Sequence, residues 1–74
     1  MKILVRGYRV RNAVNPDEVY AEEVDDRDAA FGRAQELSDF YRQPVEVVEM
    51  VAGVVTRRVG DPIEPSPMAP RVRQ

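Results

Sequence analysis

Cysteine, histidine and tryptophan are absent from the 74 residues of this chain. Without cysteine it can form neither a disulfide nor a thiolate zinc site, and the absence fits a reducing compartment. Without histidine it lacks the side chain most often used as a general base and as a metal ligand. These absences exclude the enzymes and metal proteins that depend on either residue.

The remaining candidates for chemistry are few and scattered. The hydroxyl groups outside tyrosine belong to Ser38, Thr56 and Ser66, and none lies in a nucleophile elbow or a P-loop. The four glycines are too far apart to cradle a phosphate, and the acidic residues lack the spacing of a calcium-binding loop. We therefore expect a non-enzymatic protein with no metal, no cofactor and no small-molecule substrate.

Long apolar segments are also missing. No stretch approaches the roughly 18 apolar residues of a membrane-spanning helix. The apolar run at the start ends at Arg6, short of the roughly 7 to 15 residues in the core of a signal peptide. We expect a cytoplasmic protein that does not enter a membrane.

Residues 2–11 read as a first strand whose apolar positions change parity at Gly7. A bulge at Gly7 would keep the apolar residues on one face, namely Ile3, Val5, Tyr8 and Val10. A plain strand whose two ends are buried differently is the alternative. After the turn signal Asn15-Pro16-Asp17, residues 18–24 form a second strand, and their acidic side chains suit a sheet edge.

A helix is predicted over residues 26–42, with Asp25 as its N-cap and Gln43-Pro44 as its end. Its buried stripe consists of Ala30, Ala34, Leu37 and Tyr41, flanked by Phe31 and Phe40. Gly32 lies inside the helix, where it permits close approach to the sheet or is simply tolerated.

Residues 45–51 and 54–59 are rich in β-branched side chains and are joined by Ala52-Gly53, which predicts a β-hairpin. Beyond it, four prolines punctuate a segment without apolar periodicity. We expect one domain over residues 1–60 and a proline-rich disordered tail over residues 61–74, partly as polyproline II.

This order of elements predicts an α+β fold, ββαββ, with a four-stranded antiparallel sheet in the order 2-1-3-4. The single helix covers one face of that sheet. The other face is then open to solvent or to a partner.

Charge is sorted along the chain, although the net charge is only −2. The first eleven residues contain no acid and four bases, namely Lys2, Arg6, Arg9 and Arg11. Residues 17–28 contain seven acids and one base, Arg27. Opposite fields on one small surface are typical of a protein that docks on a large charged object.

The predicted docking patch is basic and lies on the first strand, with Arg57 and Arg58 on the last strand beside it. Its members on the first strand are Arg6, Tyr8, Arg9 and Arg11. In the tail, Arg71 and Arg73 contact the partner or its nucleic acid, unless the tail is an inert extension. Basic and aromatic side chains on a sheet can also bind nucleic acid directly, but the overall acidity of the chain weakens that attraction.

Two stretches in the middle of the chain carry a resemblance to small bacteriophage proteins: Asp-Arg-Asp-Ala-Ala-Phe-Gly-Arg-Ala-Gln-Glu-Leu and Pro-Val-Glu-Val-Val-Glu-Met-Val-Ala-Gly-Val-Val. The build resembles phage regulators that bind host RNA polymerase and, as a second choice, anti-CRISPR proteins. The resemblance implies an inhibitor or regulator in the host cytoplasm. Its partner would be a large host protein or nucleoprotein complex, RNA polymerase or a CRISPR effector. Two alternatives remain: a free nucleic-acid-binding module, and an orphan enzyme or metal protein that uses the abundant carboxylates.

Overall fold

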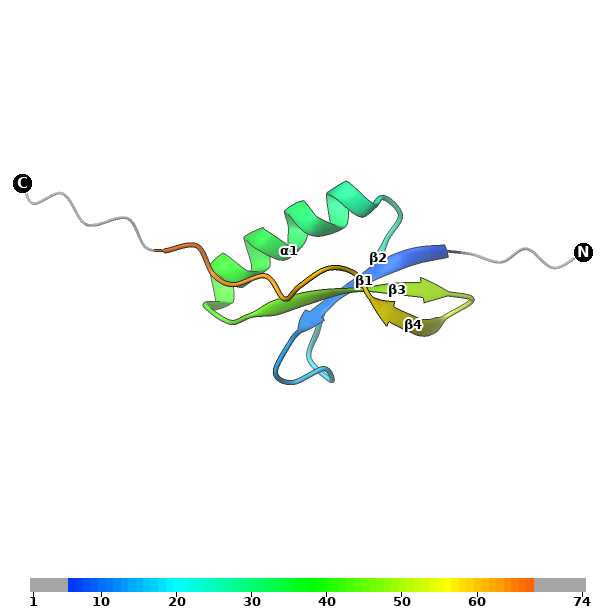
Figure 1. The fold of residues 1–74 in the computed structure, drawn as a ribbon, viewed down its shortest axis with the longest axis horizontal. Helices are drawn as coiled ribbons and strands as arrows, with labels where there is room; N and C mark the ends of the chain where they lie inside the picture. Colours follow the sequence, from blue (N-terminus) through cyan, green and yellow to red (C-terminus); the bar gives the residue numbers. More distant parts are fainter. Residues whose placement is uncertain (1–5, 68–74) are drawn as a thin grey trace, which may run out of the picture.

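The computed structural model describes residues 6–67, except for the side chain of Glu22. Five elements follow one another along this part of the chain (Figure 1). They are β1 (Arg6–Asn12), β2 (Val19–Val24), α1 (Arg27–Tyr41), β3 (Val45–Val51) and β4 (Val54–Arg58). Residues 2–5 of the predicted first strand lie outside the described part.

The strands form one antiparallel sheet in the order β2-β1-β3-β4, and α1 lies across one of its faces (Figure 1). The α+β class with a single helix is thus confirmed. An isolated antiparallel bridge between Val45 and Ile63 adds a fifth paired segment. The predicted count of four strands therefore missed a short extension of the sheet.

The core lies between α1 and the two central strands. Val10 of β1 faces Val47 of β3 across the register, and both are almost fully buried against Ala30 and Ala34 of the helix. Each fully buried valine contributes about 1.5 to 3 kcal/mol to the free energy of folding. A Cβ placed on Gly32 would meet no atom within 4 Å, so this glycine is tolerated on the outer side of the helix rather than needed for close packing.

Strand β1 runs without interruption along β3, so the predicted bulge at Gly7 does not occur. The irregularities lie instead in the pairing with β2, on either side of Val10, where β2 fits one more residue than β1 between successive pairs. Because bulges twist an edge away from flat pairing, they protect the acidic outer strand against edge-to-edge association.

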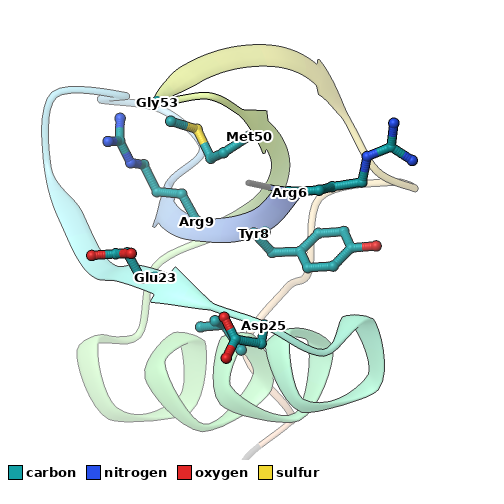
Figure 2. A pocket seen from close by; sticks show the side chains of 9 residues that line it. Arg6, Tyr8, Arg9, Glu23, Asp25, Met50 and Gly53 are labelled. Atoms are coloured by element: carbon teal, nitrogen blue, oxygen red, sulfur yellow. The ribbon is translucent and has the colours of Figure 1, made fainter. Parts of the chain in front are cut away.

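No helix covers the other face of the sheet, but several side chains on that face are buried. Glu46, Val48 and Met50 point to that face, yet they are 8%, 0% and 8% exposed. A register shift at Glu49/Met50 bends the β3–β4 hairpin, which curls over this face in Figure 2. Long side chains of neighbouring strands can shield the rest with their aliphatic stems.

Helix α1 begins one residue later than predicted, and its N-cap is Asp26 rather than Asp25. Asp26 has an extended backbone, and its carboxylate accepts a hydrogen bond from the amide of Ala29 at 2.9 Å. This is the usual N-cap contact, in which the side chain before the first helical turn accepts from the amide of the third residue after it. Within residues 6–67, no helix combines the length and apolar character needed to cross a membrane.

Replacing Asp26 with alanine is expected to lower the free energy of unfolding by about 1 kcal/mol, because one amide of the first turn loses its acceptor. Urea denaturation followed by circular dichroism measures the change. Asp25→Ala is the matched control and should change stability by less than about half that amount. Equal losses for the two variants would contradict the assignment of the cap.

The start of the predicted disordered tail needs correction, because residues 61–67 pack against the fold. Ile63 exchanges two backbone hydrogen bonds with Val45, at 2.7 and 2.9 Å. The buried Ser38 hydroxyl lies 2.7 Å from the carbonyl oxygen of Gln43 and 3.1 Å from that of Ile63. Prolines prevent a regular ladder here, since they lack an amide proton, but side-chain hydrogen bonds replace it. Arg71 and Arg73 lie outside the described residues.

Candidate functional site

The predicted basic patch on β1 is divided between the two faces of the sheet. Successive side chains of a strand point to opposite sides. Tyr8 shares the side of the buried Val10 and packs against the core beneath α1, so it is not a free stacking surface. Arg9 and Arg11 point to the opposite side.

Two glutamates on the central strand β3 bind three of the predicted docking arginines. Glu46 lies 2.6 Å from the Nε of Arg11, and both side chains are largely buried. Glu49 lies 3.1 Å from Arg57 and 4.0 Å from Arg6. The hydrogen bond from Arg57 lowers the pKa of Glu49 below its ordinary value, and Thr56 and Arg6 add to this effect. The positive field of the sheet is therefore smaller than the arginine count suggests.

Arg9 and Arg58 differ from these three residues. Among the described residues, no carboxylate lies within 4.0 Å of either guanidinium. Their strands flank Val48 on either side, so both belong to the face away from the helix. Arg58 is exposed, whereas the Nε of Arg9 is buried without a hydrogen-bond partner.

Arg9 lines a hollow of about 320 Å³ at the end of the sheet where β1 begins and the hairpin turns. Figure 2 shows Arg9 and Met50 rising on the same side of the sheet, near Gly53. The lining residues are Arg6, Gly7, Tyr8, Arg9, Glu23, Val24, Asp25, Met50 and Gly53.

The most exposed aromatic surface lies at the other end of the molecule, where α1 ends. The ring of Tyr41 stacks on Tyr20 with centroids 4.5 Å apart and meets Phe40 edge-on at 4.8 Å. Phe40 is 76% exposed and Tyr41 47%. We call Tyr20, Phe40 and Tyr41 the aromatic surface.

A second hollow of about 350 Å³ lies along the C-terminal half of α1 and includes part of the aromatic surface. Besides Phe40 and Tyr41 it is lined by Arg33, Glu36 and Leu37. This site was not predicted from the sequence, where the helical spacing placed Tyr41 in the buried stripe and Phe40 on its flank. Their adjacency alone did not reveal the exposure, because the consecutive helix residues Leu37 and Ser38 are both buried.

The polar neighbours of the aromatic surface are well defined. The hydroxyl of Tyr20 accepts a hydrogen bond from the side chain of Asn12 at 2.9 Å and donates one to Glu18 at 3.1 Å. Asn12 also accepts hydrogen bonds from the amides of Val14 and Asn15, so it organises the β1–β2 turn. Tyr20 is thus held by hydrogen bonds as well as by its stack on Tyr41.

Asp39 holds the proline-rich segment against the end of α1. Its carboxylate accepts a hydrogen bond from the amide of Ser66 at 2.7 Å and another from Gln35 at 3.1 Å. The bond from Ser66 is the main cause that lowers the pKa of Asp39 below its ordinary value of 3.8, although desolvation opposes it. The segment is therefore fixed best when Asp39 is ionised.

We expect this attachment to weaken in acid. Since the pKa of Asp39 is lower in the folded than in the unfolded chain, its contribution is present above pH 3.8 and is lost as the pH falls through the lower folded value. The amide resonance of Ser66 should report the loss in an NMR titration. Asp39→Asn should shift that resonance at neutral pH, whereas Asp61→Asn, a change in the same segment, should leave it in place. A Ser66 amide that did not respond below pH 3.8 would contradict this attachment.

Comparison with protein-family models, with curated proteins and with solved structures found no significant match. The interpretation of the sites therefore depends on their own geometry. Among the side chains that the structure describes, which exclude Glu22, no group of three or more acidic residues is placed to hold a metal ion.

Proposed function

We propose that this protein is a non-enzymatic binding module that docks on a large nucleic-acid-processing machine and regulates it, with RNA polymerase as the first candidate. The aromatic surface makes the central contact in this proposal. The basic side chains predicted from the sequence, including Arg57 and Arg58 on β4, act as a secondary field that orients the encounter.

The observation that carries the proposal is the exposure of Phe40. A phenylalanine that is 76% exposed, beside a tyrosine that is 47% exposed, keeps a large apolar area in contact with water. Aromatic residues of this kind are enriched in the energetic centres of protein interfaces. The two rings are also pre-organised by the stack on Tyr20, which lowers the entropy lost on binding.

The charges around the aromatic surface favour a protein partner over free nucleic acid. Glu18 contacts the hydroxyl of Tyr20, and Glu36 lines the adjoining hollow, against one lining base, Arg33. Arg33 itself is bound to Glu36 at 3.1 Å. Carboxylates at this position repel a phosphate backbone. The complementary partner surface is an apolar pocket with a basic rim.

The experiment that tests the proposal is affinity purification of the tagged full chain from a nuclease-treated bacterial lysate, followed by mass spectrometry. We expect subunits of RNA polymerase in the wild-type sample and their loss with Phe40→Ala. Val54→Ala is the matched control, because Val54 is also an exposed apolar residue, 62% exposed, on the hairpin far from α1 along the chain.

Three outcomes would count against this proposed function. Recovery of no nucleic-acid-processing machine would contradict the proposal as a whole. Recovery of a CRISPR effector instead would favour the anti-CRISPR alternative. A partner that disappears with nuclease treatment, together with a salt-sensitive complex in a gel shift, would indicate a free nucleic-acid-binding module.

A further inference from the structure

The hollow at the start of β1 has no role in the proposed contact through the aromatic surface. Its walls combine a charged and an apolar side chain. Arg9 and Met50 stand on one wall, and Gly7 leaves space between them because it has no side chain. A Cβ on Gly7 would approach only the carbonyl oxygen of Val24, at 3.4 Å. The space is therefore open at its base and bounded by the curled hairpin (Figure 2).

Arg9 is the unusual residue of this hollow. Its neighbours on β1, Arg6 and Arg11, each lie within 4.0 Å of a carboxylate, whereas no described carboxylate lies that close to Arg9. Glu23 also lines the hollow, but Figure 2 shows its carboxylate pointing away from the Arg9 guanidinium. The Nε–H of Arg9 is buried and unpaired. A buried donor without an acceptor is destabilising, so a ligand that brings an acceptor to the Arg9 guanidinium would gain a favourable contact there.

The lining defines the chemistry of that acceptor. A guanidinium presents parallel N–H groups that match a carboxylate in a two-point contact. Met50 adds an apolar wall on the same side of the sheet. The two arginines of the lining are balanced by Glu23 and Asp25, so the hollow as a whole carries no excess positive charge. A polyanion such as a nucleic-acid backbone gains little there, whereas a single carboxylate close to Arg9 gains a strong local contact.

We propose that this hollow binds a carboxylate carried on an apolar body, with the carboxylate on the Arg9 guanidinium and the apolar body against Met50. The same chemistry is present in a free aliphatic acid and in the C-terminal carboxylate of a peptide that ends in an apolar residue. This site is separate from the aromatic surface, so a failure of carboxylate binding and a failure to capture a partner through Phe40 are distinguishable.

The test is an NMR titration of the full chain labelled with ¹⁵N and with ¹³C methyl methionine. One arm uses sodium hexanoate, with hexanol and hexylamine as probes of the same apolar body. The other arm uses an acetylated tripeptide that ends in leucine, with its C-terminal amide as the matched probe. We expect saturable shifts of the Arg9 Nε–H and the Met50 methyl signals with a carboxylate probe and none with the neutral or cationic ones.

Arg9→Met should reduce the affinity for the carboxylate by about tenfold or more, the loss expected when a charged hydrogen bond is removed. Arg58→Met is the matched control, because Arg58 lies on the same face but is exposed, and it should bind as wild type does. Arg9→Met should also leave the melting temperature unchanged or raise it, since it removes an unpaired buried donor.

Saturation by hexanoate alone would identify a small-molecule site, and saturation by the tripeptide alone would identify a peptide site. Three results would overturn the proposal: shifts with neither carboxylate, equal binding of the amide or alcohol probe, or equal binding to the Arg9→Met protein. A large loss of stability in Arg9→Met would instead assign Arg9 a structural role.

Discussion

Phe40→Ala is expected to weaken binding to the captured partner by about 30-fold, which corresponds to about 2 kcal/mol and to a residue at the centre of an interface. The ring is mostly exposed in the free protein, so its contribution to folding is small. The edge-on contact of Phe40 with Tyr41 is worth about 0.5 to 1.5 kcal/mol. Binding kinetics with immobilised partner measure the affinity, and urea denaturation measures the stability of the same preparation.

Phe40→Ala is informative because we expect a large change in affinity with only a small change in stability. Val54→Ala should leave both affinity and stability close to wild type. Tyr20→Phe removes only the hydroxyl that bonds to Asn12 and Glu18, and it should lower stability more than affinity. If Phe40→Ala lost affinity only in proportion to lost stability, the aromatic surface would be part of the fold and not of an interface.

Arg11→Leu is expected to lower the free energy of unfolding by about 3 kcal/mol, because it leaves the carboxylate of Glu46 buried without its partner. The two residues face each other directly across β1 and β3, and their side chains are 21% and 10% exposed. This small remaining contact with water places the cost at the lower end for a buried pair. For a chain of this size such a loss is a large share of the total stability.

The double variant Arg11→Leu with Glu46→Leu should recover most of that loss, since two apolar side chains of similar size remove the unpaired charge. Denaturation of the wild type, both single variants and the double variant completes a mutant cycle. Losses that simply add would show that the pair does not act as a unit. Such a result would also return Arg11 to the set of arginines free to dock.

Local signals in the sequence predicted the elements well. The β-branched runs on both sides of Ala52-Gly53 gave the hairpin, and the stripe of Ala30, Ala34 and Leu37 gave the buried side of the helix. The N-cap was predicted one residue too early, because Asp25 and Asp26 are equally suitable as residue types. Only the backbone conformation of Asp26 distinguishes them. The packed start of the tail was missed because its contacts with Ser38 and Asp39 are distant in sequence.

The candidate sites were less predictable than the fold. Charge counting grouped the arginines of β1, but it could not show that Glu46 and Glu49 on β3 would bind three of the predicted docking arginines. These contacts depend on the register between strands, which cannot be read from a single sequence. Phe40 was read as an apolar flank of the helix. Its exposure depends on the rotation of α1 over the sheet, which is set by the packing of Ala30 and Ala34.

The central claim is that the aromatic surface touches the partner, and site-specific photocrosslinking tests it most directly. The photoreactive residue p-benzoylphenylalanine replaces Phe40 in one sample and Val54 in a second, and each full chain is irradiated in a lysate. We expect a crosslink from position 40 to a subunit of RNA polymerase or of another nucleic-acid-processing machine, and none from position 54. Crosslinks from position 54 alone, or from neither position while the partner is still captured, would contradict it.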